Sequence, residues 1–271
     1  LNTDGARVRA AAARCVVAVM QGRSLKAVLA LERIPFEDSR DRGLLEAITA
    51  DTVRHRRRLE FALSQFLEKP LPRNDLLTQC LLLTGLTQLH LLNLSEYAAV
   101  SETVEASRLL GIGVRAGLIN AVLRRSQREG LAQSTDIAIQ ESHPDWLVVS
   151  LKADWPEDWL AIIRANNQIA PTWLRVNAAQ GKRADAATAL RENAVDFILP
   201  EFPENAILLQ TAIAPTRLPG WVTGKITVQD LSAQLAAEAL SVKHDEMAWD
   251  MCAAPGGKSA QLLETHPSLL L

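Results

Sequence analysis

The stretch that decides the fold of the C-terminal part is MAWDMCAAPGGKS, residues 247–259. It begins with apolar residues around Asp250, continues with small residues, and leads into a helix-forming segment, 259–264. This order predicts a short strand over 247–252, a loop and a helix. In open α/β sheets, ligands bind at the carboxyl ends of strands, where such turns expose backbone amides. The stretch therefore predicts the start of an α/β domain with a binding site at the loop.

The composition of this loop suits an anionic or zwitterionic small molecule. Gly256 and Gly257 allow the backbone to approach a ligand closely, and the free amides of a helix N-terminus attract a carboxylate. Asp250, at the strand end, can receive an ammonium or a hydroxyl group. The loop is not a Walker motif, because the first glycine of GxxxxGK[ST] is absent, and it is not GxGxxG. An ordinary strand-to-helix turn without a ligand is the alternative interpretation.

The N-terminal half has the apolar periodicity of helices. Apolar residues recur three and four positions apart over 7–21, 43–67, 75–92, 98–110 and 114–128. Asn74 and Ser95 are candidate N-caps, since their short side chains accept hydrogen bonds from the first amides of a helix. No strand-like alternation occurs here, so we expect an all-α domain over residues 1–135.

Composition changes after residue 140. The run PTWLRVN, 171–177, alternates as a strand does, 184–192 predicts a helix, and 195–199 and 206–209 predict two further strands. These elements predict a small α+β module over 140–215. The last part, 216–271, begins with a strand-turn-strand over 221–228 and a helix over 232–240, capped by Asp230 or Ser232.

Charge and composition narrow the class of protein. The 271 residues carry a net charge of −2, but residues 1–130 hold 19 Lys/Arg and 14 Asp/Glu, a net +5, against 10 and 17 in the remainder. A basic N-terminal half is compatible with a nucleic-acid partner.

No apolar stretch is long enough for a membrane span, and the three separated cysteines contain no CxxC pair for zinc or disulfides. These features favour a cytoplasmic protein without a metal. The histidines have no metal-ligand spacing and receive no role: His55, His90, His143, His244 and His266.

Two arginine clusters are candidate contacts to RNA phosphates. The first is Arg54, Arg56, Arg57 and Arg58, and the second is Arg124, Arg125 and Arg128. Phosphate contacts would give affinity that depends on salt without reading the base sequence. The alternative is a solvated helix face whose arginines pair with Asp51 and Glu60.

The exact motif DxCAAPGGK resembles the cofactor motif of RNA 5-methylcytosine methyltransferases of the NOL1/NOP2/Sun family. VQDLSAQ at 228–234 is similar to the segment that precedes the methyltransferase fold in that family, and NNQ at 166–168 with PTWLRVN is similar to its preceding module. The helical front resembles the NusB-like RNA-binding domain of bacterial small-subunit rRNA members, above all at 98–105 and in GLINAVLR, 117–124. The resemblance covers essentially the whole chain.

This resemblance implies a multi-domain fold: a NusB-like helical domain, a small α+β module and the beginning of a Rossmann-like methyltransferase domain. It implies S-adenosylmethionine as cofactor and ribosomal RNA of the small subunit as substrate. The residues that it assigns to cofactor binding are Cys252, Ala253, Ala254, Pro255, Gly256, Gly257 and Lys258. Trp249 and Met251 stand where the family usually has aliphatic residues, and both keep the apolar character.

Methylation of cytosine at C5 needs a thiolate that adds to C6 and a base that removes the C5 proton. The family places these groups in a Pro-Cys and a later Thr-Cys motif, and this sequence has neither. No catalytic residue is therefore assigned, and we expect a truncated methyltransferase domain that is inactive alone and whose last 50 residues depend on further chain. A cysteine at a helix N-terminus can have a lowered pKa, but the resemblance places Cys252 in the cofactor loop. The alternative function is a non-enzymatic RNA-binding module built on the helical domain.

Overall fold

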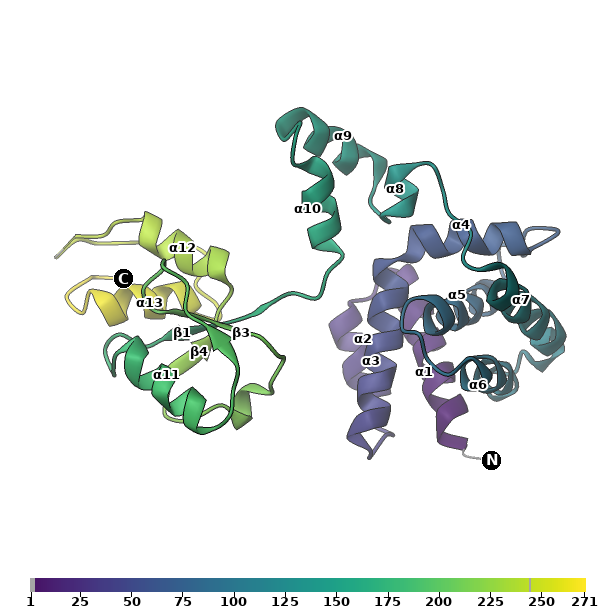
Figure 1. The fold of residues 1–271 in the computed structure, drawn as a ribbon, viewed down its shortest axis with the longest axis horizontal. Helices are drawn as coiled ribbons and strands as arrows, with labels where there is room; N and C mark the ends of the chain where they lie inside the picture. The colour runs from purple at the N-terminus through teal and green to yellow at the C-terminus, as the bar shows by residue number, and fades with distance from the viewer. Residues whose placement is uncertain (1–2, 244) are drawn as a thin grey trace. The chain divides into compact units, whose positions relative to one another are not determined.

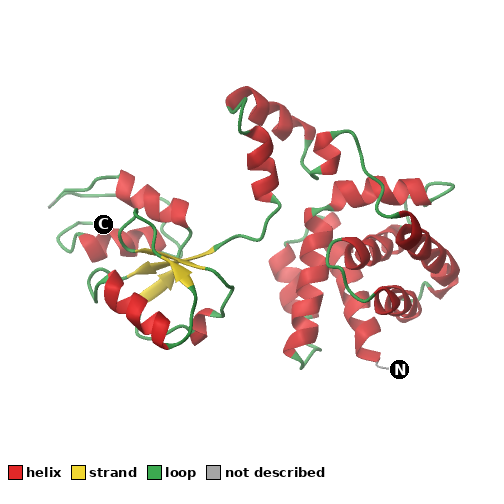
Figure 2. Cartoon of the chain, in the orientation of Figure 1, coloured by secondary structure: helices red, strands yellow, loops and turns green. Residues whose placement is uncertain are grey.

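The computed structural model describes residues 3–243 and 245–271, so His244 lies outside the described residues. The chain forms two compact units, Leu1–Gln168 and Ile169–Leu271. The first unit is helical, and every strand of the described residues belongs to the second (Figure 2). No helix in the described ranges has the length and apolar character that a membrane crossing requires.

The first unit is a bundle of helices followed by three shorter ones. The bundle contains α1 (Thr3–Met20), α2 (Leu25–Glu32), α3 (Ser39–Arg54), α4 (Arg56–Phe66), α5 (Leu76–His90), α6 (Glu96–Leu109) and α7 (Ala116–Glu129). The shorter helices are α8 (Ile137–Gln140), α9 (Asp145–Asp154) and α10 (Trp159–Asn166). The expected all-α character of this part is therefore confirmed.

Some details of the helical part differ from the sequence expectation. The helix expected over 43–67 is broken at His55, whose backbone (φ −101°, ψ 20°) separates α3 from α4. Asn74 is not an N-cap, because Asp75 stands at that position before α5. Ser95 does precede α6, but its side chain makes no capping hydrogen bond. Helix α2 was not expected, because its eight residues lie in a short run between turns.

Helix α5 is the centre of the first unit. Leu81, Leu82, Leu83 and Leu86 are all fully buried, which is typical of a helix that is apolar on all sides. Its neighbours α1, α3, α6 and α7 pack around it. Among its polar residues, Gln88 accepts a 2.8 Å hydrogen bond from the buried Arg9 of α1. Unit one therefore has its own closed core.

The second unit contains an antiparallel sheet of order β2-β3-β1-β4. Its elements are β1 (Thr172–Val176), α11 (Arg183–Glu192), β2 (Phe197–Ile198), β3 (Ala206–Leu209), β4 (Ile226–Val228), α12 (Leu231–Ala239) and α13 (Gly257–Thr265). Figure 1 shows α11 on one side of the sheet and α12 and α13 on the other. Leu174 and Val176 pack with Leu190 of α11, while Arg175, between them, lies against α13.

Strand β3 has the expected bounds, 206–209, but the other strands of the second unit are shorter than expected. The strand expected over 195–199 is Phe197–Ile198, and only the second strand of the pair expected over 221–228 forms. The strand expected over 247–252 is reduced to a parallel bridge between Met247 and Leu270. Because a single bridge is not a sheet, the Rossmann-like arrangement stays a prediction. So do the domain borders at 135/140 and 215/216, although compactness groups α8–α10 with the first unit.

Candidate functional site

The loop that carries the DxCAAPGGK motif is open to solvent. Residues 251–255 are exposed, and α13 begins at Gly257, so Gly257 and Lys258 form its first turn. Gly256 has φ 94°, a left-handed conformation that favours glycine. The first helical hydrogen bond runs from Ala260 to the carbonyl of Gly256 at 2.8 Å. The amides of the first turn therefore have no helical acceptor and can meet a ligand.

Asp250 organises this loop from its N-terminal end. Its carboxylate accepts a 3.0 Å hydrogen bond from the amide of Cys252 and another from the hydroxyl of the buried Ser259 in α13. One side chain thus links the beginning of the loop to the helix that follows it. Cys252 itself is exposed and free of any disulfide.

We predict that the pKa of Asp250 lies below the ordinary value of an aspartate. The hydroxyl of Ser259, the amide of Cys252 and the charge of Lys258 all favour the carboxylate form. The stabilisation by Asp250 is therefore complete above the ordinary pKa and is lost as pH falls through the lower folded pKa. A carboxyl-carbon NMR titration measures this, and Ser259→Ala should raise the pKa. An Asp250 that titrates at its ordinary value in both proteins contradicts the proposed loop geometry.

Arg175 of β1 forms hydrogen bonds with the helix α13 that follows the loop. Its side chain is 3% exposed and donates hydrogen bonds to the carbonyl of Gly257 at 2.9 Å and to Glu264 at 2.8 Å. These two acceptors stand at the first and last turns of α13. Burial lowers the pKa of the Arg175 guanidinium and raises the pKa of the Glu264 carboxyl, while each partner's charge counteracts the shift of the other. Strand β1 thereby holds both ends of the helix that carries the loop.

Three buried glutamines add a second connection. Gln229 donates to Gln261 at 3.2 Å, Gln261 donates to the carbonyl of Gln234 at 3.1 Å, and Gln234 donates to the carbonyl of Gln229 at 2.9 Å. The three residues come from the end of β4, from α12 and from α13. This closed ring of hydrogen bonds connects α13 to α12 and to the end of β4.

The sequence pattern does not reveal these supporting residues. Arg175 could have been suspected, because a charged residue inside an otherwise apolar strand needs a partner. Gln229 and Gln234 lie in the segment 228–234 that resembles the methyltransferase family, but no periodicity indicates that their amides are buried. The pairing of Gln229 with Gln261, 32 positions away, is visible only in the tertiary structure.

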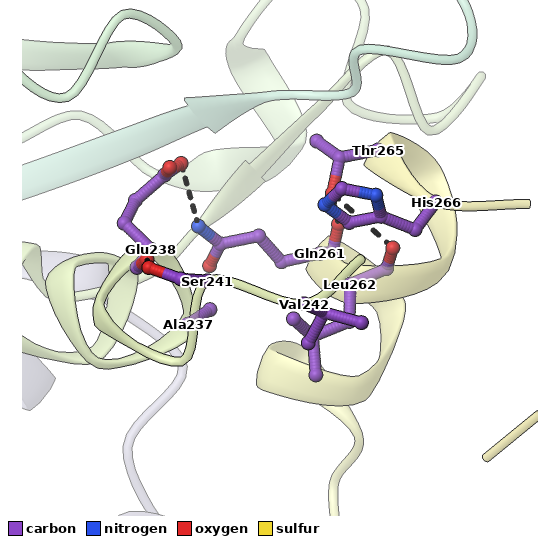
Figure 3. A pocket seen from close by; sticks show the side chains of 8 residues that line it. All are labelled: Ala237, Glu238, Ser241, Val242, Gln261, Leu262, Thr265 and His266. Atoms are coloured by element: carbon purple, nitrogen blue, oxygen red, sulfur yellow. Dashed lines mark hydrogen bonds between the residues drawn. The ribbon is translucent and has the colours of Figure 1, made fainter. Parts of the chain in front are cut away.

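A separate hollow of about 400 Å³ lies between α12 and α13 (Figure 3). Glu238, Gln261, Thr265 and His266 are among its lining residues, and Glu238 accepts a 3.4 Å hydrogen bond from Gln261 (Figure 3). None of the loop residues 252–258 lines it. The hollow and the loop are thus distinct features of the second unit.

Apolar side chains surround the loop on its strand side. Met247, Trp249 and Met251 are 71%, 85% and 92% exposed, and Leu270 is 61% exposed. The strand side of the loop therefore exposes apolar surface to solvent. The expectation that the last 50 residues depend on further chain for their folding stays a prediction.

The first arginine cluster is largely engaged within the protein. Arg54 pairs with Asp51, and Arg56 lies 3.5 Å from Glu60. Arg57 bonds to Asp145 at 2.9 Å and thereby fastens α9 to α4. These pairs match the alternative of a helix face with Asp51 and Glu60. In the second cluster Arg125 pairs with Glu129, whereas Arg124 and Arg128 are exposed and have no partner among the described residues.

Two family models match the chain in consecutive segments. Residues 6–128 match the NusB family, and residues 143–216 match the ferredoxin-like domain of RsmF/B-like methyltransferases. The first segment corresponds to the helical bundle. The second includes the sheet strands β1 to β3, in agreement with the expected α+β module.

Named relatives resemble almost the whole chain. The ribosomal RNA small subunit methyltransferase B of Xanthomonas campestris is 44% identical over 98% of this chain and 61% of its own length. The protein of the same name from Xylella fastidiosa is 42% identical over 99% of this chain and 62% of its own length. The chain thus spans about three fifths of these relatives.

Among solved structures, that of PH0851 covers 97% of this chain and 61% of the other chain, with a TM-score of 0.71. Its 15% sequence identity shows the fold alone. The family follows from the sequence relatives and from the two matched segments. The chain therefore belongs to the same family as the proteins named ribosomal RNA small subunit methyltransferase B, and it spans about 61% of their length.

Proposed function

We propose that a protein carrying this chain transfers a methyl group from S-adenosylmethionine to C5 of a cytosine in small-subunit ribosomal RNA. The observation that carries the proposal is the exposed DxCAAPGGK loop at the start of α13, with its first-turn amides free. Family membership supports the substrate class, because the named relatives are ribosomal RNA methyltransferases. The C5 position rests on the resemblance of the loop to that of the 5-methylcytosine enzymes.

The residues of the loop fit this cofactor. S-adenosylmethionine carries a carboxylate, which the free amides of a helix N-terminus attract, and an ammonium, which Asp250 can attract. A Cβ on Gly256 would lie 3.8 Å from its nearest neighbour, the carbonyl oxygen of Ala253, so the backbone is accessible there. We propose that the cofactor is held by Cys252, Ala253, Ala254, Pro255, Gly256, Gly257 and Lys258. When bound, it supplies an electrophilic methyl group.

The chain's own contribution is to bind and orient. Asp250 holds Ser259 and the amide of Cys252, and Arg175 holds the carbonyl of Gly257, so the loop is fixed before the cofactor arrives. Such preorganisation lowers the entropic cost of binding. The thiolate that adds to the base and the group that removes the proton are assigned to the Pro-Cys and Thr-Cys motifs, which this sequence does not contain.

A labelled-methyl transfer assay on unmodified small-subunit rRNA tests the proposal. We expect no turnover by the 271-residue polypeptide, because it has neither nucleophile motif. A polypeptide in which this sequence is followed by both motifs should label cytosine at C5, as read by nucleoside mass spectrometry. Changing its Thr-Cys cysteine to Ala should abolish transfer. Label on another base or position, or turnover by the 271 residues alone, would contradict the proposed chemistry.

A further inference from the structure

A hollow of about 560 Å³ lies in the first unit where α6 and α7 pack together, far along the chain from the cofactor loop. Residues of both helices and Ala6 of α1 line it. A hydrogen bond between Gln127 and Glu96 joins the end of α7 to the start of α6, so the two helices are antiparallel. We call this hollow the α6–α7 groove.

An aromatic side chain stands at the groove without a packing role. Tyr97 lines it and is 76% exposed, whereas the neighbouring Val100 is 1% exposed and belongs to the core. Tyr97 is also the only tyrosine of the 271 residues. An exposed ring beside a buried apolar wall can stack with a flat ligand.

Three polar side chains of the groove lack partners among the described residues. The Ser101 hydroxyl is buried and has no hydrogen-bond partner among the described residues. Asn120 and Arg124, one turn apart on α7, are exposed and make no hydrogen bond or ion pair within the described ranges. A buried hydroxyl without a partner costs free energy, so a ligand with polar edges would relieve that cost.

Among the charged side chains that line the groove, Arg124 is the one without an oppositely charged partner in the described residues. Glu105 pairs with Arg108. Burial lowers the pKa of the Arg9 guanidinium, and the nearby charge of Glu102 partly offsets that effect. Both carboxylates that line the groove thus have a cationic neighbour. Arg124 has no such partner among the described residues, and the segment 1–130 carries a net +5. The free cation favours an anionic ligand.

We propose that the α6–α7 groove binds an unpaired nucleobase of RNA together with its phosphate. Tyr97 stacks on the base, the Ser101 hydroxyl and the Asn120 amide bond to its edge, and Arg124 contacts the phosphate. An apolar peptide helix would bury these three polar groups without partners, at a cost that a nucleotide avoids. The choice of RNA rests on the proposed function, since the groove's chemistry alone also suits other nucleotides.

The single tyrosine makes a direct test possible. The full chain is labelled with fluorotyrosine, which gives one fluorine NMR signal, and is titrated with a short single-stranded RNA of mixed sequence. We expect the signal to shift with RNA and to shift less with the same RNA as a duplex, whose bases are paired. Inorganic polyphosphate, which has phosphates but no bases, should leave the signal in place.

Matched variants distinguish binding of RNA in the groove from non-specific attraction of RNA to the positive charge of the domain. Tyr97→Ala should weaken RNA binding by about tenfold or more, and Tyr97→Phe should change it by about twofold at most, because stacking needs only the ring. Arg124→Ala should weaken binding and reduce the salt dependence by about one counterion. Arg128→Ala, one turn away and outside the groove, is the control and should weaken single-stranded RNA binding clearly less than Arg124→Ala.

Two results would contradict the proposal that the α6–α7 groove binds a nucleobase. One is a fluorine signal that stays in place while the RNA saturates the protein, and the other is an equal effect of Arg124→Ala and Arg128→Ala. These titrations contain no methyl donor. A negative result would therefore contradict the groove proposal alone, and the methyl-transfer assay would still test the proposed function. Conversely, a groove that binds bases stands even if no methyl transfer is found.

Discussion

Replacement of Arg175 by Met is expected to lower the free energy of unfolding of the second unit by about 3–5 kcal/mol. Met keeps most of the apolar length of the side chain but leaves the carboxylate of Glu264 and the carbonyl of Gly257 without their donor. Removing one member of a buried ion pair costs more than the pair contributes, because the remaining charge stays desolvated. The predicted loss is therefore large for a single substitution.

Hydrogen exchange of the β1 and β3 amides in a urea series measures this loss in the second unit alone. Arg217→Met is the matched control, because Arg217 is exposed and has no partner among the described residues, so its effect should stay within about 0.5 kcal/mol. The double variant Arg175→Met/Glu264→Leu should recover much of the stability, since it removes the stranded carboxylate.

The defect should also depend on pH. Burial already raises the pKa of Glu264, and loss of Arg175 raises it further. The folded state then binds more protons than the unfolded state, so stability falls as pH rises through the folded pKa. The deficit of Arg175→Met should therefore shrink in acid. A defect equal to that of the control, or one that grows as pH falls, would show that Arg175 does not hold α13.

Gly85→Val is expected to destabilise the first unit by about 3 kcal/mol. A Cβ at Gly85 would lie 2.7 Å from Cδ2 and 2.9 Å from Cδ1 of Leu123, which is fully buried between α5 and α7. Because Leu123 is enclosed by the core, its side chain has little room to move aside. Helix propensity alone predicts the opposite sign, because Gly is the poorer helix former.

Gly43→Val is the matched control, because Gly43 stands in α3, is exposed, and has nothing within 4 Å of a Cβ. Its effect on stability should be neutral or slightly favourable. Denaturation followed by hydrogen exchange of α5 amides compares the two. Adding Leu123→Ala to Gly85→Val should restore part of the loss by making space. If Gly85→Val and Gly43→Val change the stability equally, then α5 and α7 do not approach each other as closely as described at Gly85.

The helical front could be predicted from sequence, because helix formation depends on contacts three and four positions apart. The periodic runs of α1, α5, α6 and α7 are such local signals. The break between α3 and α4 at His55 could not be predicted, since no Gly or Pro marks it. The strand expected over 247–252 is wrong as a strand, because strand formation needs a pairing partner, and only Leu270 pairs with it.

The sequence by itself determined the family and the DxCAAPGGK motif, because these depend on the identity and order of adjacent residues. Only the tertiary structure decided what supports that loop. Arg175 lies 82 positions from Gly257, and Gln229 lies 32 positions from Gln261. It also decided which arginines are engaged and that Arg124 lines a groove with Tyr97. Such pairings depend on how distant elements pack, and no local pattern of residue types encodes that distance.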